Sequence, residues 1–409
     1  MRLSCVSSVS CTCRLPTHAE MSLVGKPQGI RKISRRRLLV LIGLCEFRAG
    51  LKAQEKRNQF IRLTDSDLVL ETRLETLGRN WITANEDFFV LSRAPVDVSE
   101  EERSNWQLSI AGEVEHAIDL SIEELRNPKV FPRVDVYACI QCAGYGRRFF
   151  EPAFEVAPWG VGAIGNAHWR GVRLADVLER VRLRPTAKHV AFAGRDVTAV
   201  NPPYIKSIPL EKAIGPETLL ALEMNGVELP VAHGGPLRML VPGWAGTYSV
   251  KWLQRIEGRA EPWNGYWMSV AYQLPAATAG SGSRTAAAPT TPITAVMVNS
   301  MITKPLQGDR IPAKSSVIEG FAWSGSAPID RVEISTNGGK SWRAATLSSP
   351  NYRFAWRRWQ ASWTPSPGVY HIIARARDRS GATQPLERTK WNPGGYEWRT
   401  APSISVTVV

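Results

Sequence analysis

A run of small and polar residues divides the sequence into two parts. Residues 276–292 read AATAGSGSRTAAAPTTP, a composition typical of a linker or a long surface loop. Such a run offers no apolar face, so the chain on each side of it has to bury a core of its own. With 409 residues, the chain is long enough for two cores. The sequence therefore predicts two domains, residues 59–275 and 293–409, joined by a linker at 276–292.

The two parts differ in periodicity. Before the linker, β-rich runs such as WQLSIAG (106–112) alternate with helical segments such as LADVLERV (174–181), which predicts an α+β domain. After it, runs such as IDRVEISTNGGKSW (329–342) alternate with period two and are broken by turn residues. Short strands separated by such turns are typical of a β-sandwich.

The net charge of +14 does not by itself predict a nucleic-acid-binding protein. Residues 1–60 hold 12 of the 51 basic residues and 3 of the 37 acidic ones, so this tail alone carries +9. In the tail, RKISRRRLLVLIGLCEF places paired arginines before a short apolar run, the layout of an export signal of the twin-arginine type. The apolar run is too short to span a bilayer. We expect residues 1–58 to be an export signal or tail and the protein to be periplasmic.

Two of the six cysteines, Cys139 and Cys142, lie outside this tail, too few for a disulfide framework. The pair could be half a zinc site, a redox disulfide, or one metal-ligating thiolate. Zinc would need further clustered ligands, and a redox pair would begin a helix rather than precede a glycine-rich turn. If RVDVYACIQ (133–141) is a strand, Cys139 is a buried apolar residue. Cys142 then lies at the turn beside Arg147 and Arg148, whose charges favour a thiolate that suits a thiophilic metal.

The segment IQCAGYGRRFF (140–150) resembles the molybdenum-ligating cysteine motif of the sulfite oxidase family, which includes bacterial sulfite dehydrogenases and sulfane dehydrogenase-like proteins. Residues 158–181, 204–257 and 391–396 resemble further family segments in the same order, and with NWITANEDFFV (80–90) the resemblance covers about residues 80–400. It implies an α+β molybdopterin-binding domain with the sulfite oxidase fold, followed by an immunoglobulin-like β-sandwich often used for dimerisation.

The resemblance also implies a molybdenum-molybdopterin cofactor, with Cys142 as the only protein ligand of the metal. The phosphate and the pterin ring need charged and planar donors. By match to the family's motifs, the residues that hold the cofactor are Asp196, His233, Arg238, Lys251 and the backbone of Ser249 and Val250. The resemblance further implies an active-site tyrosine and an oxyanion pocket, formed by Tyr204, Trp159 and either Arg147 or Arg148. A glycine insertion in the cysteine motif leaves open which arginine points inward.

Departures from the family bear on the substrate. In FFVLSR (88–93), Leu91 stands where many members have an arginine that contacts the substrate, and Tyr145 replaces an asparagine of the cysteine motif. An arginine of the second domain is also replaced, near Ala327 and Pro328. Each lost charge-assisted contact weakens anion binding by roughly 1.5–3 kcal/mol. Arg93, two residues after Leu91, is the candidate to compensate.

The activity implied by the resemblance is oxygen-atom transfer to sulfite or a related sulfur compound. The sequence has no Cys-x-x-Cys-His haem motif, so we expect electrons to pass to an external carrier such as cytochrome c. The implied partners are a small oxyanion substrate and either a second copy of the chain or a haem subunit. Two alternatives stay open: a molybdenum reductase of sulfoxides or another oxyanion, and a non-catalytic subunit of a sulfur-oxidising complex.

Overall fold

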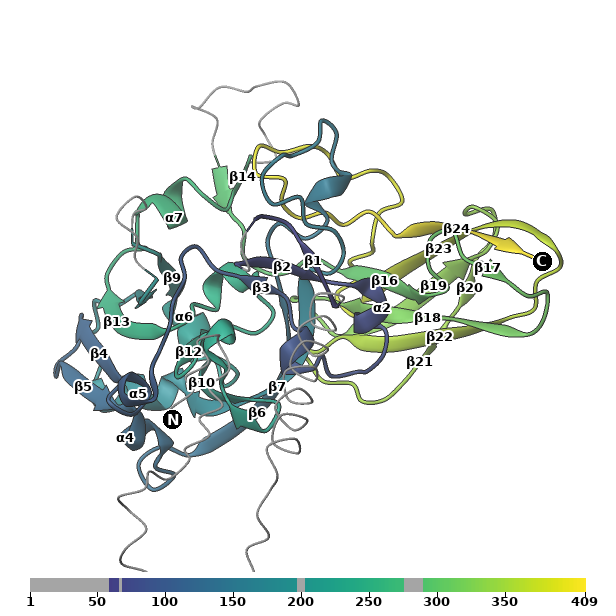
Figure 1. Ribbon diagram of the computed structural model, residues 1–409. Helices are drawn as coiled ribbons and strands as arrows, with labels where there is room; N and C mark the ends of the chain where they lie inside the picture. Colours follow the sequence, from purple (N-terminus) through teal and green to yellow (C-terminus); the bar gives the residue numbers. More distant parts are fainter. Residues whose placement is uncertain (1–58, 66–67, 197–202, 276–289) are drawn as a thin grey trace, which may run out of the picture. The chain divides into compact units, whose positions relative to one another are not determined.

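The computed structural model of the protein describes residues 59–65, 68–196, 203–275 and 290–409 (Figure 1). The expected export signal and most of the predicted linker lie outside these residues. Within the described ranges, no helix combines the length and the apolar character needed to cross a bilayer.

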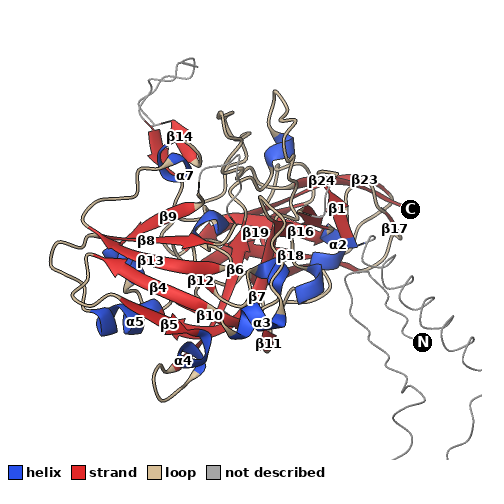
Figure 2. Cartoon of the chain, turned by 60° about the vertical axis from the view of Figure 1, so that its left-hand side comes forward, coloured by secondary structure: helices blue, strands red, loops and turns tan. Residues whose placement is uncertain are grey.

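Three sheets form most of the chain before the predicted linker (Figure 2). The first has the order β1 (Phe60–Arg62), β2 (Val69–Thr72), β3 (Val90–Leu91). The second has the order β11 (Val227–Glu228), β10 (Leu219–Met224), β7 (Ile164–Arg173), β6 (Arg133–Gln141), with β12 (Arg238–Leu240) also paired to β10. The third has the order β5 (Ile118–Ser121), β4 (Gln107–Gly112), β13 (Leu253–Arg259), β8 (His189–Gly194), β9 (Ile205–Pro209). Only the β4–β13 pair among these described strands is parallel.

Short helices connect these strands. They are α2 (Leu74–Leu77), α3 (Glu100–Ser104), α4 (Ile122–Arg126), α5 (Leu174–Val181), α6 (Leu210–Ala213) and α7 (Tyr266–Ser269), with 3₁₀ turns at Asn85–Asp87, Arg147–Phe149, Val231–His233 and Gly246–Tyr248. The sequence of α5 places apolar residues at positions i, i+3, i+4 and i+7, and all four are buried. Their shared face joins a core to which strands of the second and third sheets also contribute, so burial of this face holds α5 against both.

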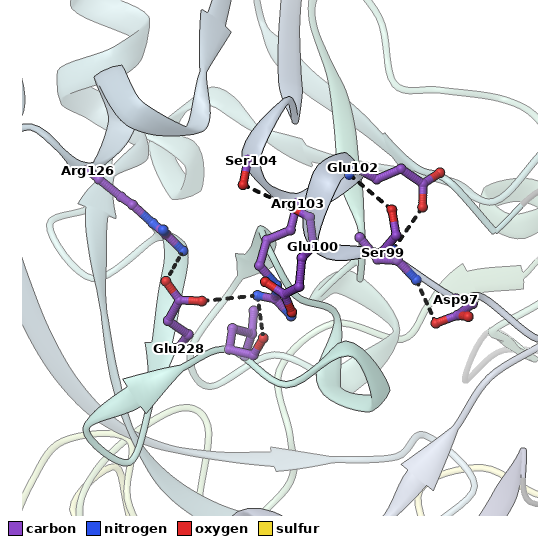
Figure 3. Close-up of polar contacts among 10 residues, drawn as sticks. Asp97, Ser99, Glu100, Glu102, Arg103, Ser104, Arg126 and Glu228 are labelled. Carbon is purple, nitrogen blue, oxygen red and sulfur yellow. Dashed lines mark hydrogen bonds and ion pairs between the residues drawn. The ribbon is translucent and has the colours of Figure 1, made fainter. Parts of the chain in front are cut away.

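Helix α3 is tied to the loop that enters the pocket described below. It begins with a serine–glutamate capping box. Arg103 of α3 donates to the Leu229 carbonyl at 3.3 Å and lies 3.6 Å from Glu228, which also pairs with Arg126 of α4 at 2.8 Å (Figure 3). These contacts anchor β11 just before the 3₁₀ turn that carries His233.

The chain after the predicted linker forms two facing sheets (Figure 1). One has the order β16 (Asn299–Lys304), β18 (Ser316–Trp323), β22 (Arg357–Trp363), β21 (Thr346–Leu347). The other has the order β17 (Arg310–Ile311), β24 (Ser403–Val408), β23 (Gly368–Asp378), β19 (Ile329–Ser335), β20 (Arg343–Ala344). Alternate residues of both sheets point inward to a shared apolar core that includes Ile318, Val332, Trp359 and Ile372.

The predicted fold class, an α+β domain followed by a β-sandwich, is confirmed. Strand β6 has the bounds expected for RVDVYACIQ, and residues 329–344 form the hairpin expected from Asn-Gly-Gly. The last three residues of the predicted linker form β15 (Thr290–Pro292), which pairs with β14 (Gln273–Pro275). The exact domain bounds remain a prediction.

Candidate active site

A pocket lies where several loops of the first domain meet. Eight of the predicted site residues line it: Cys142, Asp196, Tyr204, His233, Arg238, Ser249, Val250 and Lys251. The sequence places these residues in segments up to about a hundred residues apart, so the fold, and not local sequence, assembles the pocket.

Cys142 follows the last residue of β6 and is buried, with 7% of its surface exposed. Its amide donates to the Ala163 carbonyl at 2.9 Å, and its carbonyl accepts from Tyr145 at 3.0 Å, so the backbone is fixed on both sides. Burial raises the pKa of the thiol, although the charges of Arg147 and Arg93 act in the opposite direction. The charge of Arg147 does favour the thiolate, as predicted, but burial outweighs it and the pKa of the thiol stays raised. A bound metal ion would still take the deprotonated form.

The two arginines of the cysteine motif have different environments. Arg147 acts electrostatically on Cys142, but its guanidinium donates to carbonyls at Ala157 and Gly395 (3.4 Å each) and it does not line the pocket. Arg148 pairs with the buried carboxylate of Glu71 at 2.7 Å. Of the two, the structure brings Arg147 toward the thiol and directs Arg148 to Glu71.

Trp159 and Tyr145 are core residues in this structure. Trp159 is 1% exposed and packs edge-on against Phe89, with ring centres 6.0 Å apart, and it does not line the pocket. Tyr145 is 2% exposed and packs edge-on against Trp323 of the sandwich. Burial raises the pKa of Tyr145, so its hydroxyl stays neutral. Trp159 acts behind the pocket wall, not as part of it.

Two cations, the buried Arg238 and the half-buried Lys251, line the part of the pocket near His233. Arg238 donates to the carbonyls of Ser249 (3.1 Å) and His233 (2.9 Å), and burial lowers its pKa to about 9. Lys251 donates to Ser92 at 2.7 Å and to the Ala232 carbonyl, and burial, followed by the charge of Arg238, lowers its pKa to about 7. Neither cation has a carboxylate within 4.0 Å among the described residues, so a ligand anion would compensate both.

Asp196 faces the same space as a potential acceptor. Its Oδ1 atom is buried and has no hydrogen-bond partner among the described residues. Burial raises the pKa of this carboxyl to about 6, with the charges of Lys251 and Arg93 acting in the opposite direction. A buried acceptor without a partner is costly in the protein alone and indicates a ligand that donates N–H groups.

His233, Ser249 and Val250 are held by internal hydrogen bonds. The His233 Nε2 atom lies 2.7 Å from the Asn85 carbonyl. The Ser249 amide donates to Gly246 at 3.1 Å, and the Val250 carbonyl accepts from Met239 at 2.9 Å. The Ser249 N–H thus donates within the protein, and the role of the Ser249 and Val250 backbone in holding the cofactor stays a prediction.

Tyr204 and Arg93 form the aromatic side of the pocket. The Tyr204 hydroxyl donates to the Thr247 carbonyl at 2.8 Å, and burial raises its pKa well above the ordinary value, so Oη keeps its proton. The Arg93 guanidinium carbon lies 3.8 Å from the centre of the Trp267 ring, and Arg93 also donates to the Tyr272 hydroxyl. Sequence reasoning missed Trp267 and Tyr272; the aromatic-rich run WNGYWMSVAYQL (263–274) was the available signal.

The residues present fit molybdopterin. A thiol that could ligate a metal, two cations suited to a phosphate, and an acceptor suited to a pterin N–H all line one pocket. The residues that would hold the group are therefore Cys142, Arg238, Lys251 and Asp196.

Comparisons with known proteins agree with this fit. Residues 94–267 match the family described as oxidoreductase molybdopterin binding domain, and residues 290–398 match the Mo-co oxidoreductase dimerisation domain. The chain is 34% identical over 331 residues to a sulfite oxidase of Gallus gallus, which covers 77% of this chain and 70% of that protein. It is 35% identical over 327 residues to the mitochondrial sulfite oxidase of Homo sapiens, covering 76% of this chain but 58% of the human protein.

A solved structure has a similar fold. The sulfane dehydrogenase SoxCD of Paracoccus pantotrophus aligns with a TM-score of 0.73 and 25% sequence identity, over 86% of this chain and 88% of that one. The alignment extends over both parts of the chain.

Proposed function

This chain belongs to the sulfite oxidase family of molybdenum oxidoreductases, and we propose that it oxidises sulfite or a related small sulfur anion by oxygen-atom transfer. The observation that carries the proposal is the position of the Cys142 thiol, which lines the same pocket as Asp196, Arg238 and Lys251. A thiol, an acceptor without a partner and two cations without carboxylates form an incomplete site, and a metal-bearing anionic cofactor completes it.

When bound, the molybdenum cofactor supplies the oxygen-atom and two-electron chemistry. The protein's residues bind and orient the reactants. Arg238 and Lys251 hold the cofactor's phosphate, Asp196 accepts from its ring N–H groups, and Cys142 ligates the metal. Tyr204 keeps its proton on Oη and turns this donor from the Thr247 carbonyl to a substrate oxygen.

The electron acceptor and the assembly follow from the same proposal. Electrons pass to an external carrier such as cytochrome c, and residues 293–409 mediate a homodimer or the contact with a haem subunit. The name of the matched second family, a dimerisation domain, supports the homodimer. Paired arginines at Arg35 and Arg36 support export to the periplasm in the folded state.

A second candidate substrate is a sulfane sulfur. Leu91 lines the pocket with an apolar side chain where sulfite oxidases of the family have an arginine, which favours a less charged substrate. The likeness to a sulfane dehydrogenase supports the same reading.

The test is sulfite-dependent reduction of ferricyanide by protein with a measured molybdenum content, with Cys142→Ser as the control. The proposal expects turnover in the wild type and loss of both molybdenum and turnover in the folded variant. Loaded wild-type protein that oxidises no sulfite would refute the sulfite assignment. Turnover with a small persulfide instead would support the sulfane candidate, and reoxidation of reduced protein by a sulfoxide would support a reductase.

A further inference from the structure

Arg93 is clamped by three aromatic rings at the edge of the pocket near Cys142. Its guanidinium carbon lies 3.8 Å from the centre of the Trp267 ring, and 5.4 and 5.8 Å from the centres of the Tyr204 and Tyr272 rings. The rings restrict the plane of the guanidinium while leaving its charge in place. Arg93 and Cys142 line the same pocket, so this charge faces the space beside the thiol.

The Arg93 guanidinium has N–H groups that can donate hydrogen bonds to a ligand. A guanidinium carries five N–H groups, and the side-chain hydrogen bond that Arg93 makes within the described part of the chain goes to the Tyr272 hydroxyl. Within the same part, no carboxylate lies within 4.0 Å of it. Leu91, two residues earlier, also lines the pocket but offers neither charge nor donor.

A further cation, the buried Lys206 of β9, packs against this aromatic clamp. It is 1% exposed, donates to the Trp267 carbonyl at 2.7 Å, and has its Nζ atom 5.0 Å from the centre of the Tyr272 ring. It too has no carboxylate within 4.0 Å among the described residues. The half-buried Arg93 and the buried Lys206 thus contact the same Tyr272 ring without a nearby acid, which is unfavourable in the protein alone, and an anion at Arg93 would relieve this.

We propose that Arg93 binds the oxyanion group of the substrate, and that Lys206 strengthens this contact as a positioning residue behind the aromatic clamp. The proposal deepens the proposed function, on which it rests, by naming the residue that recognises the substrate. The ligand class is a small sulfur oxyanion whose oxygens accept a two-point contact from a planar guanidinium.

The experiment measures two quantities on molybdenum-loaded protein: the dissociation constant of sulfate, an unreactive probe, and KM and kcat for sulfite. Arg93→Gln is expected to raise the sulfate Kd and the sulfite KM about 10- to 100-fold, the usual effect of losing one charge-assisted contact. Arg93→Lys keeps the charge but loses the planar two-point contact of the guanidinium, so its sulfate Kd and sulfite KM should lie between those of wild type and Arg93→Gln. Arg195→Gln is the matched control, because Arg195 pairs with Glu102 and does not line the pocket.

The pH dependence of sulfate binding by Lys206→Met tests the proposed role of Lys206. Burial, followed by the charge of Arg93, lowers the pKa of Lys206 to about 7, so its charge is lost as pH rises through this value. Arg93, Tyr248 and Tyr272 face Lys206, and Asp196 and Lys251 also titrate near this range, so the variant is compared with wild type at each pH. Lys206→Met should weaken sulfate binding severalfold at pH 6 and hardly at pH 9.

The outcomes separate this proposal from the proposed function. Unchanged sulfate Kd and sulfite KM in Arg93→Gln would overturn the proposal while leaving sulfite oxidation in place. A wild type that oxidises no sulfite, but loses sulfate binding on Arg93→Gln, would refute the sulfite assignment and retain the anion subsite. An equal effect of Lys206→Met at pH 6 and pH 9 would overturn the role of Lys206.

Discussion

The carboxylate of Glu71 lies 2.7 Å from the guanidinium of Arg148 and keeps this side chain out of the pocket. Glu71 also accepts from the amides of Gly160 and Gly162 at 2.8 and 3.1 Å. One buried carboxylate therefore holds both the turn after Cys142 and the loop after Trp159.

Glu71→Ala is expected to destabilise the protein by about 2–4 kcal/mol, because it leaves two buried amides and one arginine without an acceptor. Arg148→Gln should cost less, since the arginine is 36% exposed and the carboxylate keeps its amide donors. Urea unfolding of the two variants measures both values. Equal decreases in the free energy of unfolding of Glu71→Ala and Arg148→Gln would contradict this account.

Arg147→Gln and Arg148→Gln should differ in their effect on the Cys142 thiol. The charge of Arg147 lowers the pKa of the thiol, so Arg147→Gln should raise it further. Arg148→Gln should leave it unchanged, because that charge is paired with Glu71. The measurement is the thiolate absorbance of cofactor-free protein against pH, with Cys142→Ser subtracted to remove other thiols. A shift in both variants would refute the distinction.

Lys206→Met is expected to stabilise the cofactor-free protein at neutral pH. The pKa of Lys206 and that of Lys251 are lowered by burial to about 7, whereas an unfolded lysine titrates near 10.4. Between about pH 7 and pH 10 the unfolded chain thus binds more protons than the folded one, so the free energy of unfolding rises with pH. Lys206→Met removes the contribution of one of these two lysines. The variant should therefore have a higher free energy of unfolding at pH 7 and a smaller increase of this free energy between pH 7 and pH 10.

Urea unfolding at pH 6, 7, 8 and 9 checks this prediction. A variant that is less stable than wild type at pH 6, with an unchanged slope, would show that the Lys206 hydrogen bond to Trp267 outweighs the cost of its charge.

Asp196→Asn should weaken cofactor retention while stabilising the empty protein above pH 6. Burial raises the pKa of Asp196 to about 6, above the unfolded value, so the charged form lowers stability as pH rises from about 4 to 6. The amide removes this charge but replaces one acceptor oxygen by a donor. Molybdenum and pterin per chain, together with the thermal midpoint at pH 5 and pH 7.5, test both effects. Undiminished cofactor content would remove Asp196 from the site.

Local sequence was sufficient for the elements with clear periodicity. The bounds of β6 follow from its alternation up to Gln141, and the apolar spacing of LADVLERV gives α5. The motif match placed Cys142 and Arg238 in one pocket because the family motifs carry the positions that meet in space.

The side-chain directions after Cys142 could not be predicted in the same way. Gly146 has φ +73°, and a Cβ there would lie 2.5 Å from Trp398, so the turn depends on a residue about 250 positions away. Arg147 and Arg148 take their directions from this turn and from distant partners. The clamp around Arg93 joins residues 93 and 272, and no local pattern encodes such a contact.

Residues 395–398 pack against the turn that carries Cys142. Glu397 donates its amide to Ala143, Gly395 accepts from Arg147, and Trp398 packs against Gly146. A ribosome makes these residues about 250 positions after Cys142, so the turn that carries Cys142 reaches its final packing only after the sandwich strands have been synthesised. A chain that stops before residue 395 would therefore lack the packing of this turn, even though residues 59–275 are complete.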